Sequence, residues 1–164
     1  MRHLSASPNP PRVFLDASVL IAGSASFTGA SRAVLILGEL RLLKLVVCPH
    51  VLQEAERNLV KKLPEALADY RTLLAHLPLE TISDPAPEAL LPWLDIVAAK
   101  DAPIVVAAKS AGVQRLVTLD AQHLTGKPDL ARAAGLLICR PGELIEEIRT
   151  AIALGLWVSP PAPE

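Results

Sequence analysis

The chain has 164 residues, which suits one domain, and it is 51 % hydrophobic, only 3 % aromatic, and close to neutral with a formal net charge of -1. No apolar stretch approaches the roughly 18 residues that a membrane-spanning helix needs. The near-neutral charge disfavours a protein that binds nucleic acid through a basic surface alone. The first eleven residues lack the apolar block of a secretion signal, so we expect a cytoplasmic protein.

Five short β-type runs follow one another along the chain, with helical patterns between them. The runs occupy residues 12–15, 44–48, 79–82, 115–119 and 136–139. Apolar residues recur with helical spacing from about 50 to 63, 67 to 77 and 144 to 152. Strands that alternate with helices predict an α/β domain of three layers, in which helices cover both faces of a parallel sheet. We expect this domain to span 12–153, with flexible tails at 1–11 and 155–164.

The segment 33–43 differs from the other helical patterns because it is apolar on nearly every side. This composition predicts a helix that is buried on both sides or one that forms a subunit interface.

Four acidic residues are expected to meet at one edge of the sheet. Asp16 directly follows the first strand, and Asp120 directly follows the fourth. Glu54 lies in the opening turns of the helix after the second strand, and Asp101 precedes the helix that leads into the fourth. The carboxyl ends of parallel strands share one edge, so all four carboxylates converge there. Each alone has a plainer explanation: Asp101 as a helix cap, Glu54 as a solvated residue, Asp120 in a turn.

Such a cluster predicts a divalent cation. Carboxylates about 4 Å apart repel by several kcal/mol at an effective dielectric constant near 20, unless a cation neutralises them or their pKa values rise. Oxygen ligands favour Mg²⁺ or Mn²⁺ over Zn²⁺. The four histidines show no ligand spacing, and we expect His123 to be an exposed loop residue.

Other chemistries fit the sequence less well. A phosphatase of the haloacid dehalogenase type needs a second aspartate where this chain has Ser18. A phosphate-binding P-loop is absent, because Ala121 stands where the motif before Gly126-Lys127 requires glycine. Cys48 and Cys139 each lack a neighbouring cysteine, which predicts buried, reduced thiols instead of a zinc site or disulfide.

At this point the sequence resembles the PIN-domain family over about residues 12–149. The resemblance is carried by Val13-Phe14-Leu15-Asp16-Ala17-Ser18-Val19-Leu20, Glu54, Lys100-Asp101-Ala102-Pro103-Ile104 and Leu116-Val117-Thr118-Leu119-Asp120. It implies a five-stranded parallel sheet in the order 3-2-1-4-5, with the switch point between strands one and four. It also implies metal-dependent hydrolysis of phosphodiester bonds in single-stranded RNA.

The resemblance further implies roles for individual residues. The catalytic and metal-binding positions match Asp16, Glu54, Asp101 and Asp120, and positions that orient a carboxylate or a water match Ser18 and Thr118. Candidates for holding the RNA backbone are Lys100, Lys109, Lys127 and Arg57. Gln122 is a departure, since the family often has a further acid there, and this argues against a second metal ion.

Small PIN domains are often toxins held by a cognate antitoxin, and often homodimers, so the resemblance implies both partners here. The expected function is therefore a Mg²⁺- or Mn²⁺-dependent endoribonuclease that could serve as the toxin of a toxin–antitoxin pair. The alternative is a non-catalytic PIN-fold protein that binds or scaffolds, which Gln122 and the near-neutral charge favour.

Overall fold

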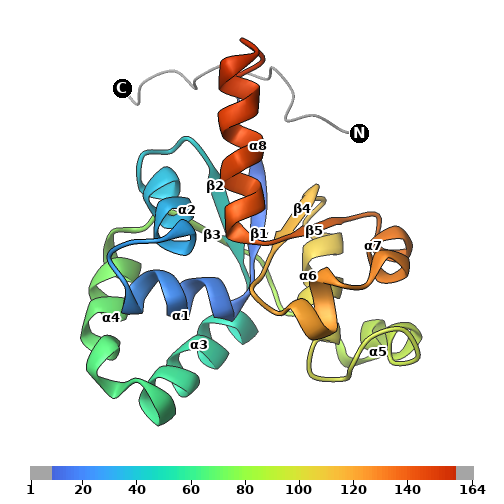
Figure 1. The fold of residues 1–164 in the computed structure, drawn as a ribbon. Coiled ribbons are helices and arrows are strands. Elements are labelled where there is room, and N and C mark those ends of the chain that lie inside the picture. The colour runs from blue at the N-terminus through green and yellow to red at the C-terminus, as the bar shows by residue number, and fades with distance from the viewer. Residues whose placement is uncertain (1–8, 158–164) are drawn as a thin grey trace.

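The computed structural model describes residues 9–157, which form a parallel sheet with helices on both faces (Figure 1). Its strands, in the spatial order β3-β2-β1-β4-β5, are β1 (Arg12–Leu15), β2 (Lys44–Val47), β3 (Leu79–Thr81), β4 (Arg115–Val117) and β5 (Leu137–Cys139). Every neighbouring pair is parallel. The predicted three-layer α/β/α fold and strand order are thereby confirmed. Of the two predicted tails, only residues 9–11 and 155–157 are among the described residues.

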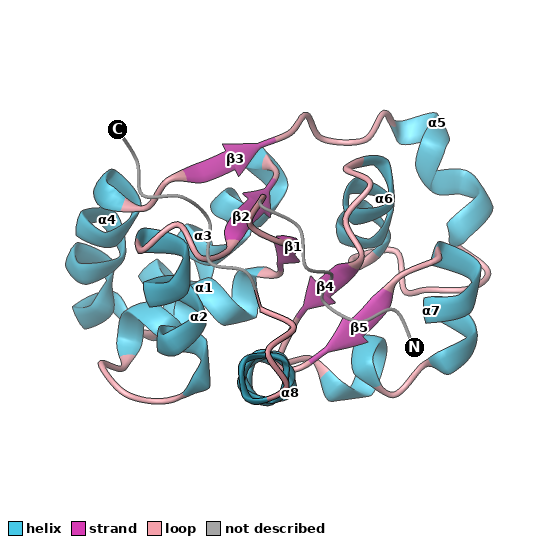
Figure 2. Cartoon of the chain, turned by 90° about the horizontal axis from the view of Figure 1, so that it is seen from above, coloured by secondary structure: helices cyan, strands magenta, loops and turns pink. Residues whose placement is uncertain are grey.

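Helices and short turns connect the strands. They are α1 (Ala17–Ala25), α2 (Ala30–Glu39), α3 (Pro49–Lys62), η1 (Pro64–Ala66), α4 (Leu67–His76), α5 (Pro87–Leu90), η2 (Leu91–Trp93), α6 (Ala102–Ser110), the π-helical turn η3 (Ala121–Thr125), α7 (Pro128–Ala134) and α8 (Pro141–Ala153). Proline stands in the first turn of α3, α6, α7 and α8. A backbone N–H at this position has no acceptor within the helix, so its absence in proline costs no hydrogen bond. Helices α1, α2 and α8 lie on one side of the sheet and α6 lies on the other (Figure 2).

The central strands of the sheet are buried from solvent. In β1, Val13, Phe14 and Leu15 have no exposed surface, and Leu116 and Val117 of β4 are equally buried. Strands buried on both faces are continuously apolar, as these are. The charged residues that end or follow the strands are therefore confined to the edges of the sheet.

Several predicted bounds need correction. The third strand ends at Thr81 instead of residue 82, and the fifth begins at Leu137 instead of residue 136. The second strand ends at Val47, because Cys48 is the extended residue before Pro49, the first residue of α3. The fourth ends at Val117, beyond which Leu119 is exposed. The helix predicted within 33–43 is α2, which ends at Glu39. Residues 40–43 form a turn in which Arg41 has a positive φ of 57°.

The segment 33–43 is also not buried on every side. Val34 and Leu35 are buried, but Ile36 and Leu40 are exposed. Cys48 is a buried free thiol as predicted, whereas Cys139 is only partly buried. No single described helix is long and apolar enough to span a membrane, although α1 and α2 together meet the criterion of length and composition with a 96° bend between them.

Candidate active site

Asp16 and Thr118 meet where β1 and β4 end. Leu15 pairs with Val117 in the register of these strands, so the next residue of each strand lies at the carboxyl edge of the sheet. The Asp16 amide donates to the Val117 carbonyl at 3.0 Å, and the Thr118 hydroxyl donates to Asp16 Oδ2 at 2.7 Å. This junction is the switch point of the sheet, since the chain moves outward from β1 to β2 and β3 on one side and from β4 to β5 on the other.

Three donors hold the Asp16 carboxylate. Besides Thr118, the Ser18 hydroxyl donates to Oδ2 at 2.8 Å and the Ala17 amide donates to Oδ1 at 2.8 Å. Asp16 is also the N-cap of α1 and is only 6 % exposed. The two hydroxyls are fixed in turn, because Ser18 accepts from the Leu119 amide and Thr118 from the Asp120 amide, each at 3.0 Å. Ser18 and Thr118 therefore lie where they can orient a carboxylate.

Glu54 and Asp101 are held much less completely. Glu54 Oε2 and Asp101 Oδ2 are the buried side-chain atoms without a hydrogen-bond partner among residues 9–157. Asp101 occupies the N-cap position of α6, yet its backbone is helical and its side chain makes no capping hydrogen bond. Capping thus does not explain this 5 % exposed carboxylate.

Burial dominates the ionisation of these two groups. Burial raises the pKa of Glu54, and the nearby Asp16 charge raises it further. Burial also raises the pKa of Asp101, against the opposing effect of the Lys100 ammonium. Both carboxyls would release their protons more readily if a cation were bound between them.

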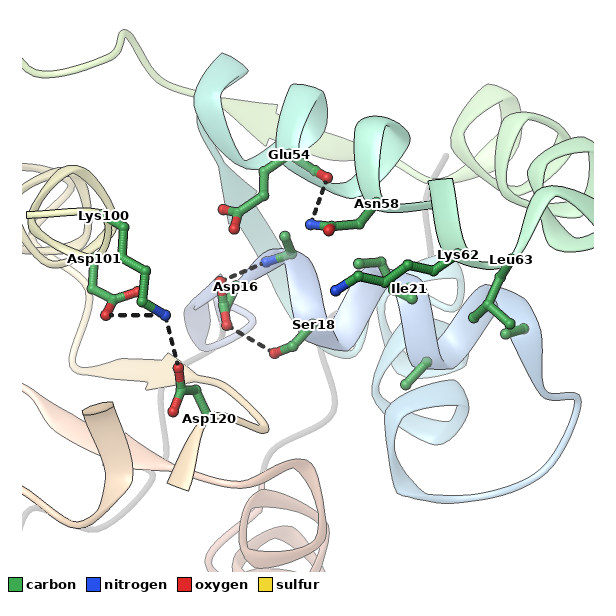
Figure 3. Close-up of a pocket in the computed structure, with 13 residues that line it drawn as sticks. Asp16, Ser18, Ile21, Glu54, Asn58, Lys62, Leu63, Lys100, Asp101 and Asp120 are labelled. Atoms are coloured by element: carbon green, nitrogen blue, oxygen red, sulfur yellow. Dashed lines mark hydrogen bonds and ion pairs between the residues drawn. The ribbon is translucent and has the colours of Figure 1, made fainter. Parts of the chain in front are cut away.

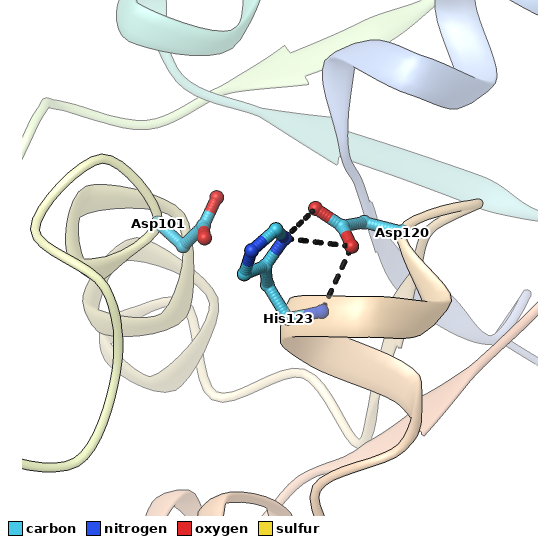
Figure 4. A group of neighbouring side chains, drawn as sticks. All are labelled: Asp101, Asp120 and His123. Atoms are coloured by element: carbon cyan, nitrogen blue, oxygen red, sulfur yellow. Dashed lines mark hydrogen bonds and ion pairs between the residues drawn. The ribbon is translucent and has the colours of Figure 1, made fainter.

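Asp120 is partnered by His123 and Lys100. The His123 amide donates to Asp120 Oδ1 at 2.9 Å, and the ring Nδ1 lies 3.1 Å from Oδ2 (Figure 4). Lys100 Nζ lies 3.7 Å from Asp120 Oδ2 and 3.6 Å from Asp101 Oδ2. Burial alone would raise the pKa of Asp120, but the hydrogen bonds and charges of His123 and Lys100 together hold it below its ordinary value.

These carboxylates line one cavity of about 440 Å³ (Figure 3). The residues that line it are Asp16, Ala17, Ser18, Ile21, Ala22, Ala25, Glu54, Asn58, Lys62, Leu63, Lys100, Asp101 and Asp120. All four predicted acids therefore face the same space, although they come from four separate segments of the chain.

The donor set fits a divalent cation. Two buried carboxylate oxygens accept no hydrogen bond, although Lys100 Nζ lies 3.6 Å from Asp101 Oδ2 and His50 Nε2 lies 3.9 Å from Glu54 Oε2. A third carboxylate, that of Asp16, is fixed by three donors. The site therefore offers oxygen ligands of the kind that Mg²⁺ and Mn²⁺ prefer. His123 adds a nitrogen: atoms of Asp101, Asp120 and His123 lie within 4.8 Å of one another. The residues that could hold the ion are thus the four acids, with His123 beside them.

The lysines and arginine predicted to hold the RNA backbone are scattered. Of these four predicted residues, only Lys100 lines the cavity. Lys109 Nζ contacts the Ala133 carbonyl and the ring of Trp93, Lys127 is exposed before α7, and Arg57 is exposed on α3.

Sequence reasoning passed over two polar residues of the site. Asn58 and Lys62 follow Glu54 at helical spacing on α3, which is the signal that could have placed them on its face. His123, expected to be an exposed loop residue, is instead half-buried in η3, and this turn brings its ring onto the Asp120 carboxylate.

Comparison with known proteins identifies the family. The model of the PIN domain matches residues 12–122. No curated protein matches the chain in sequence. Among solved structures, Pyrobaculum aerophilum PAE2754 is similar with a TM-score of 0.59 and 20 % identity, over 92 % of this chain and 97 % of that one.

Two further similar structures carry toxin–antitoxin names. VapBC2 from Rickettsia felis, bound to a DNA fragment from its promoter, has a TM-score of 0.58 and 16 % identity, over 79 % of this chain and 98 % of that one. Mycobacterium tuberculosis VapC20, described as a sarcin–ricin loop cleaving toxin, has a TM-score of 0.55 and 16 % identity, over 76 % of this chain and 97 % of that one. Such distant likenesses show the fold alone, but the family model covers well over half of the sequence: the chain belongs to the PIN-domain family.

Proposed function

We propose that this protein is a cytoplasmic hydrolase of phosphodiester bonds, a Mg²⁺- or Mn²⁺-dependent endoribonuclease that cleaves single-stranded RNA. The observation that carries the proposal is the pair of buried oxygens, Glu54 Oε2 and Asp101 Oδ2, that accept no hydrogen bond and face a cavity that Asp16 and Asp120 share. Leaving buried acceptors unpaired costs about 1–3 kcal/mol each, a cost that a bound cation would remove. Membership of the PIN-domain family supports the same reading.

The acidic residues of the cavity have different roles in the proposed hydrolysis. A bound Mg²⁺ or Mn²⁺ would supply a water of lowered pKa and positive charge beside the phosphate. Asp16, whose carboxylate is fixed by Thr118, Ser18 and Ala17, would be one of the residues that hold the ion. Asp101 or Asp120 would orient the attacking water or accept its proton, since both carboxylates line the cavity. In-line attack leaves a 5′-phosphate and a 3′-hydroxyl.

The test is cleavage of a labelled single-stranded RNA with Mn²⁺, Mg²⁺ or EDTA. Asp16→Asn and Asp101→Asn should each lower the metal-dependent rate by about a hundredfold or more. Glu56→Gln should cleave like wild type, because Glu56 pairs with Arg71 of α4 and does not line the cavity. Equal cleavage by wild type and both aspartate variants would assign the activity to a contaminant. A cyclic phosphate product would contradict the hydrolytic mechanism.

We also propose that the protein is a toxin with a cognate antitoxin and that it forms a homodimer through α2. The similarity to VapBC structures supports the antitoxin, and the exposed Ile36 (40 %) and Leu40 (63 %) at the end of α2 offer an apolar contact. Sedimentation velocity should show a dimer that Ile36→Lys weakens. A monomer at all concentrations would remove the homodimer from the proposal.

Lys100 favours a second candidate, a non-catalytic binding or scaffolding protein. Its ammonium lies between Asp101 and Asp120, where it can neutralise part of the cluster without a metal. Gln122 and the low net charge point the same way. A melting temperature that responds to neither Mn²⁺ nor chelator would support this candidate over the nuclease.

A further inference from the structure

The cavity continues well beyond the acidic cluster. From the carboxylates it runs between α1 and α3, where it is lined by Ile21, Ala22 and Ala25 on one side and Asn58, Lys62 and Leu63 on the other. We call this part the α1–α3 cleft. A metal ion with six waters needs less than half of the 440 Å³, since each water takes up about 30 Å³. The remaining volume can hold a further chemical group.

The two ends of the cavity carry opposite charge. Its two lysines are Lys62 and Lys100, and Lys100 already contacts two carboxylates. Within residues 9–157, no carboxylate lies within ion-pair distance of Lys62. Figure 3 shows the Lys62 ammonium pointing along the cleft toward Ser18 and Asp16. An uncompensated cation thus faces the space next to the candidate metal site.

We propose that the α1–α3 cleft binds the nucleotide next to the cleaved phosphate, with the ammonium of Lys62 on the phosphate of that nucleotide. The inference rests on the proposed nuclease function and adds a subsite to it. Ile21 and Leu63 offer apolar surface to the sugar or base. Asn58 Nδ2 donates to the Glu54 carbonyl at 3.0 Å, which leaves Asn58 Oδ1 to accept from a hydroxyl or an amino group.

The shape of the site has a consequence for the substrate. A base can enter a cleft between two helices only after it leaves its stack and its pairing partner, which costs less in a single strand than in a duplex. The cleft therefore selects for unpaired RNA. Its continuity with the acidic cluster and its free cation favour a nucleotide over a protein segment as the occupant.

The chain offers a matched pair of variants for the test. Lys61 and Lys62 both lie in the last turn of α3, so each contributes similarly to the helix dipole, but only Lys62 lines the cavity. Fluorescence anisotropy with a short labelled oligouridine in Ca²⁺ would give the dissociation constant across a NaCl series. Lys62→Met should weaken binding about three- to tenfold and reduce the salt slope by about 0.7, while Lys61→Met should stay within about twofold of wild type.

A second variant fills the cleft without touching a charge. Ala22→Leu should raise KM with little change in kcat, as should Lys62→Met, because neither residue belongs to the acidic cluster. Equal weakening by Lys61→Met and Lys62→Met would overturn the subsite in favour of diffuse charge. RNA affinity unchanged in Lys62→Met and Ala22→Leu would overturn it in favour of a protein occupant. A wild type that neither binds nor cleaves RNA would refute the proposed function itself, and the subsite with it.

Discussion

At the scale of single residues, hydrogen bonds are distributed unevenly over the four acids. Asp16 accepts three and Asp120 is paired with His123, whereas one buried oxygen of Glu54 and one of Asp101 accept no hydrogen bond. The side chains of Asp16 and Asp120 are therefore held in place without a cation. The burial of the Glu54 and Asp101 carboxyls instead lowers the stability of the metal-free protein, which is typical of binding sites.

This unevenness predicts that Glu54→Gln and Asp101→Asn stabilise the metal-free protein. Each amide removes a buried charge whose pKa burial already raises, and can donate a hydrogen bond to a neighbouring carboxylate. We expect a gain of about 1 kcal/mol in the free energy of unfolding in EDTA. Mn²⁺ should raise the melting temperature of wild type but not that of either variant.

Glu56→Gln is the control, because Glu56 lies on the same helix as Glu54 but pairs with Arg71 at the surface. It should neither stabilise the protein in EDTA nor lose the response to Mn²⁺. If Glu54→Gln were as destabilising as a typical buried substitution, the contact of Glu54 Oε2 with His50 Nε2 at 3.9 Å would be a stabilising ion pair and the cost of the buried charge would be refuted.

The sequence alone could place the four acids but not the partners of Asp120. Asp16 and Asp120 follow strands, so their position at one edge was a matter of topology. The pairing of Asp120 with His123 depends on the π-helical turn, and the position of Lys100 depends on side-chain rotamers, neither of which an apolar pattern encodes. Lys109 was a plausible RNA contact by charge, but it lies in the last turn of α6, whereas Asp101 precedes the first.

At the scale of the elements, α2 packs closely on β2. A Cβ atom added to Gly38 would come within 2.2 Å of Leu45 Cδ1 and 2.7 Å of Leu45 Cγ. Leu45 is fully buried, so a shift of its side chain would have to be accommodated within the core.

Gly38→Ala should therefore destabilise the protein by about 1–3 kcal/mol, because overpacking outweighs the gain in helix propensity. Gly142→Ala in α8 is the matched control, since its added Cβ meets nothing nearer than 3.9 Å. It should be neutral or mildly stabilising. Urea denaturation of both variants measures the difference, and equal stabilities would show that Leu45 repacks freely.

Two ion pairs of Glu80 link three neighbouring strands. In β3, Glu80 Oε1 lies 2.6 Å from Arg12 Nη2 of β1, and Glu80 Oε2 lies 3.4 Å from Lys44 Nζ of β2. The Arg12 hydrogen bonds, together with the charges of Arg12 and Lys44, lower the pKa of Glu80 despite the opposing effect of burial. The pair thus stabilises the fold above the ordinary pKa of the carboxyl, 4.5, and this contribution is lost as the pH falls through the lower folded value.

Glu80→Gln should accordingly cost up to about 1 kcal/mol at neutral pH and progressively less toward about pH 3. Chemical denaturation of wild type and variant over this pH range measures the difference. Glu88→Gln, at a surface position with no ion pair among the described residues, is the control and should show no such trend. A cost that persists unchanged at pH 3 would refute the electrostatic explanation.

The elements were easier to predict than their ends. Strand identity follows from continuous apolar runs, but residue 48 looks like part of a strand until Pro49 begins α3. The end of α2 at Glu39 could not be predicted from the apolar run 33–43, because the turn at 40–43 is as apolar as the helix before it. Local chemistry therefore identifies the elements, whereas their ends depend on backbone geometry.

At the scale of the whole molecule, one contact joins distant parts of the chain. The Thr118 hydroxyl that orients Asp16 is separated from it by 102 residues, and β1 pairs with β4 only after β2 and β3 have been made. A nascent chain that has not yet reached Thr118 and Asp120 thus has neither the donor nor the full acid set. The site can form only after the ribosome has begun the last third of the chain, where Thr118 and Asp120 lie. The ribosome that makes this protein therefore meets a complete site only late in synthesis.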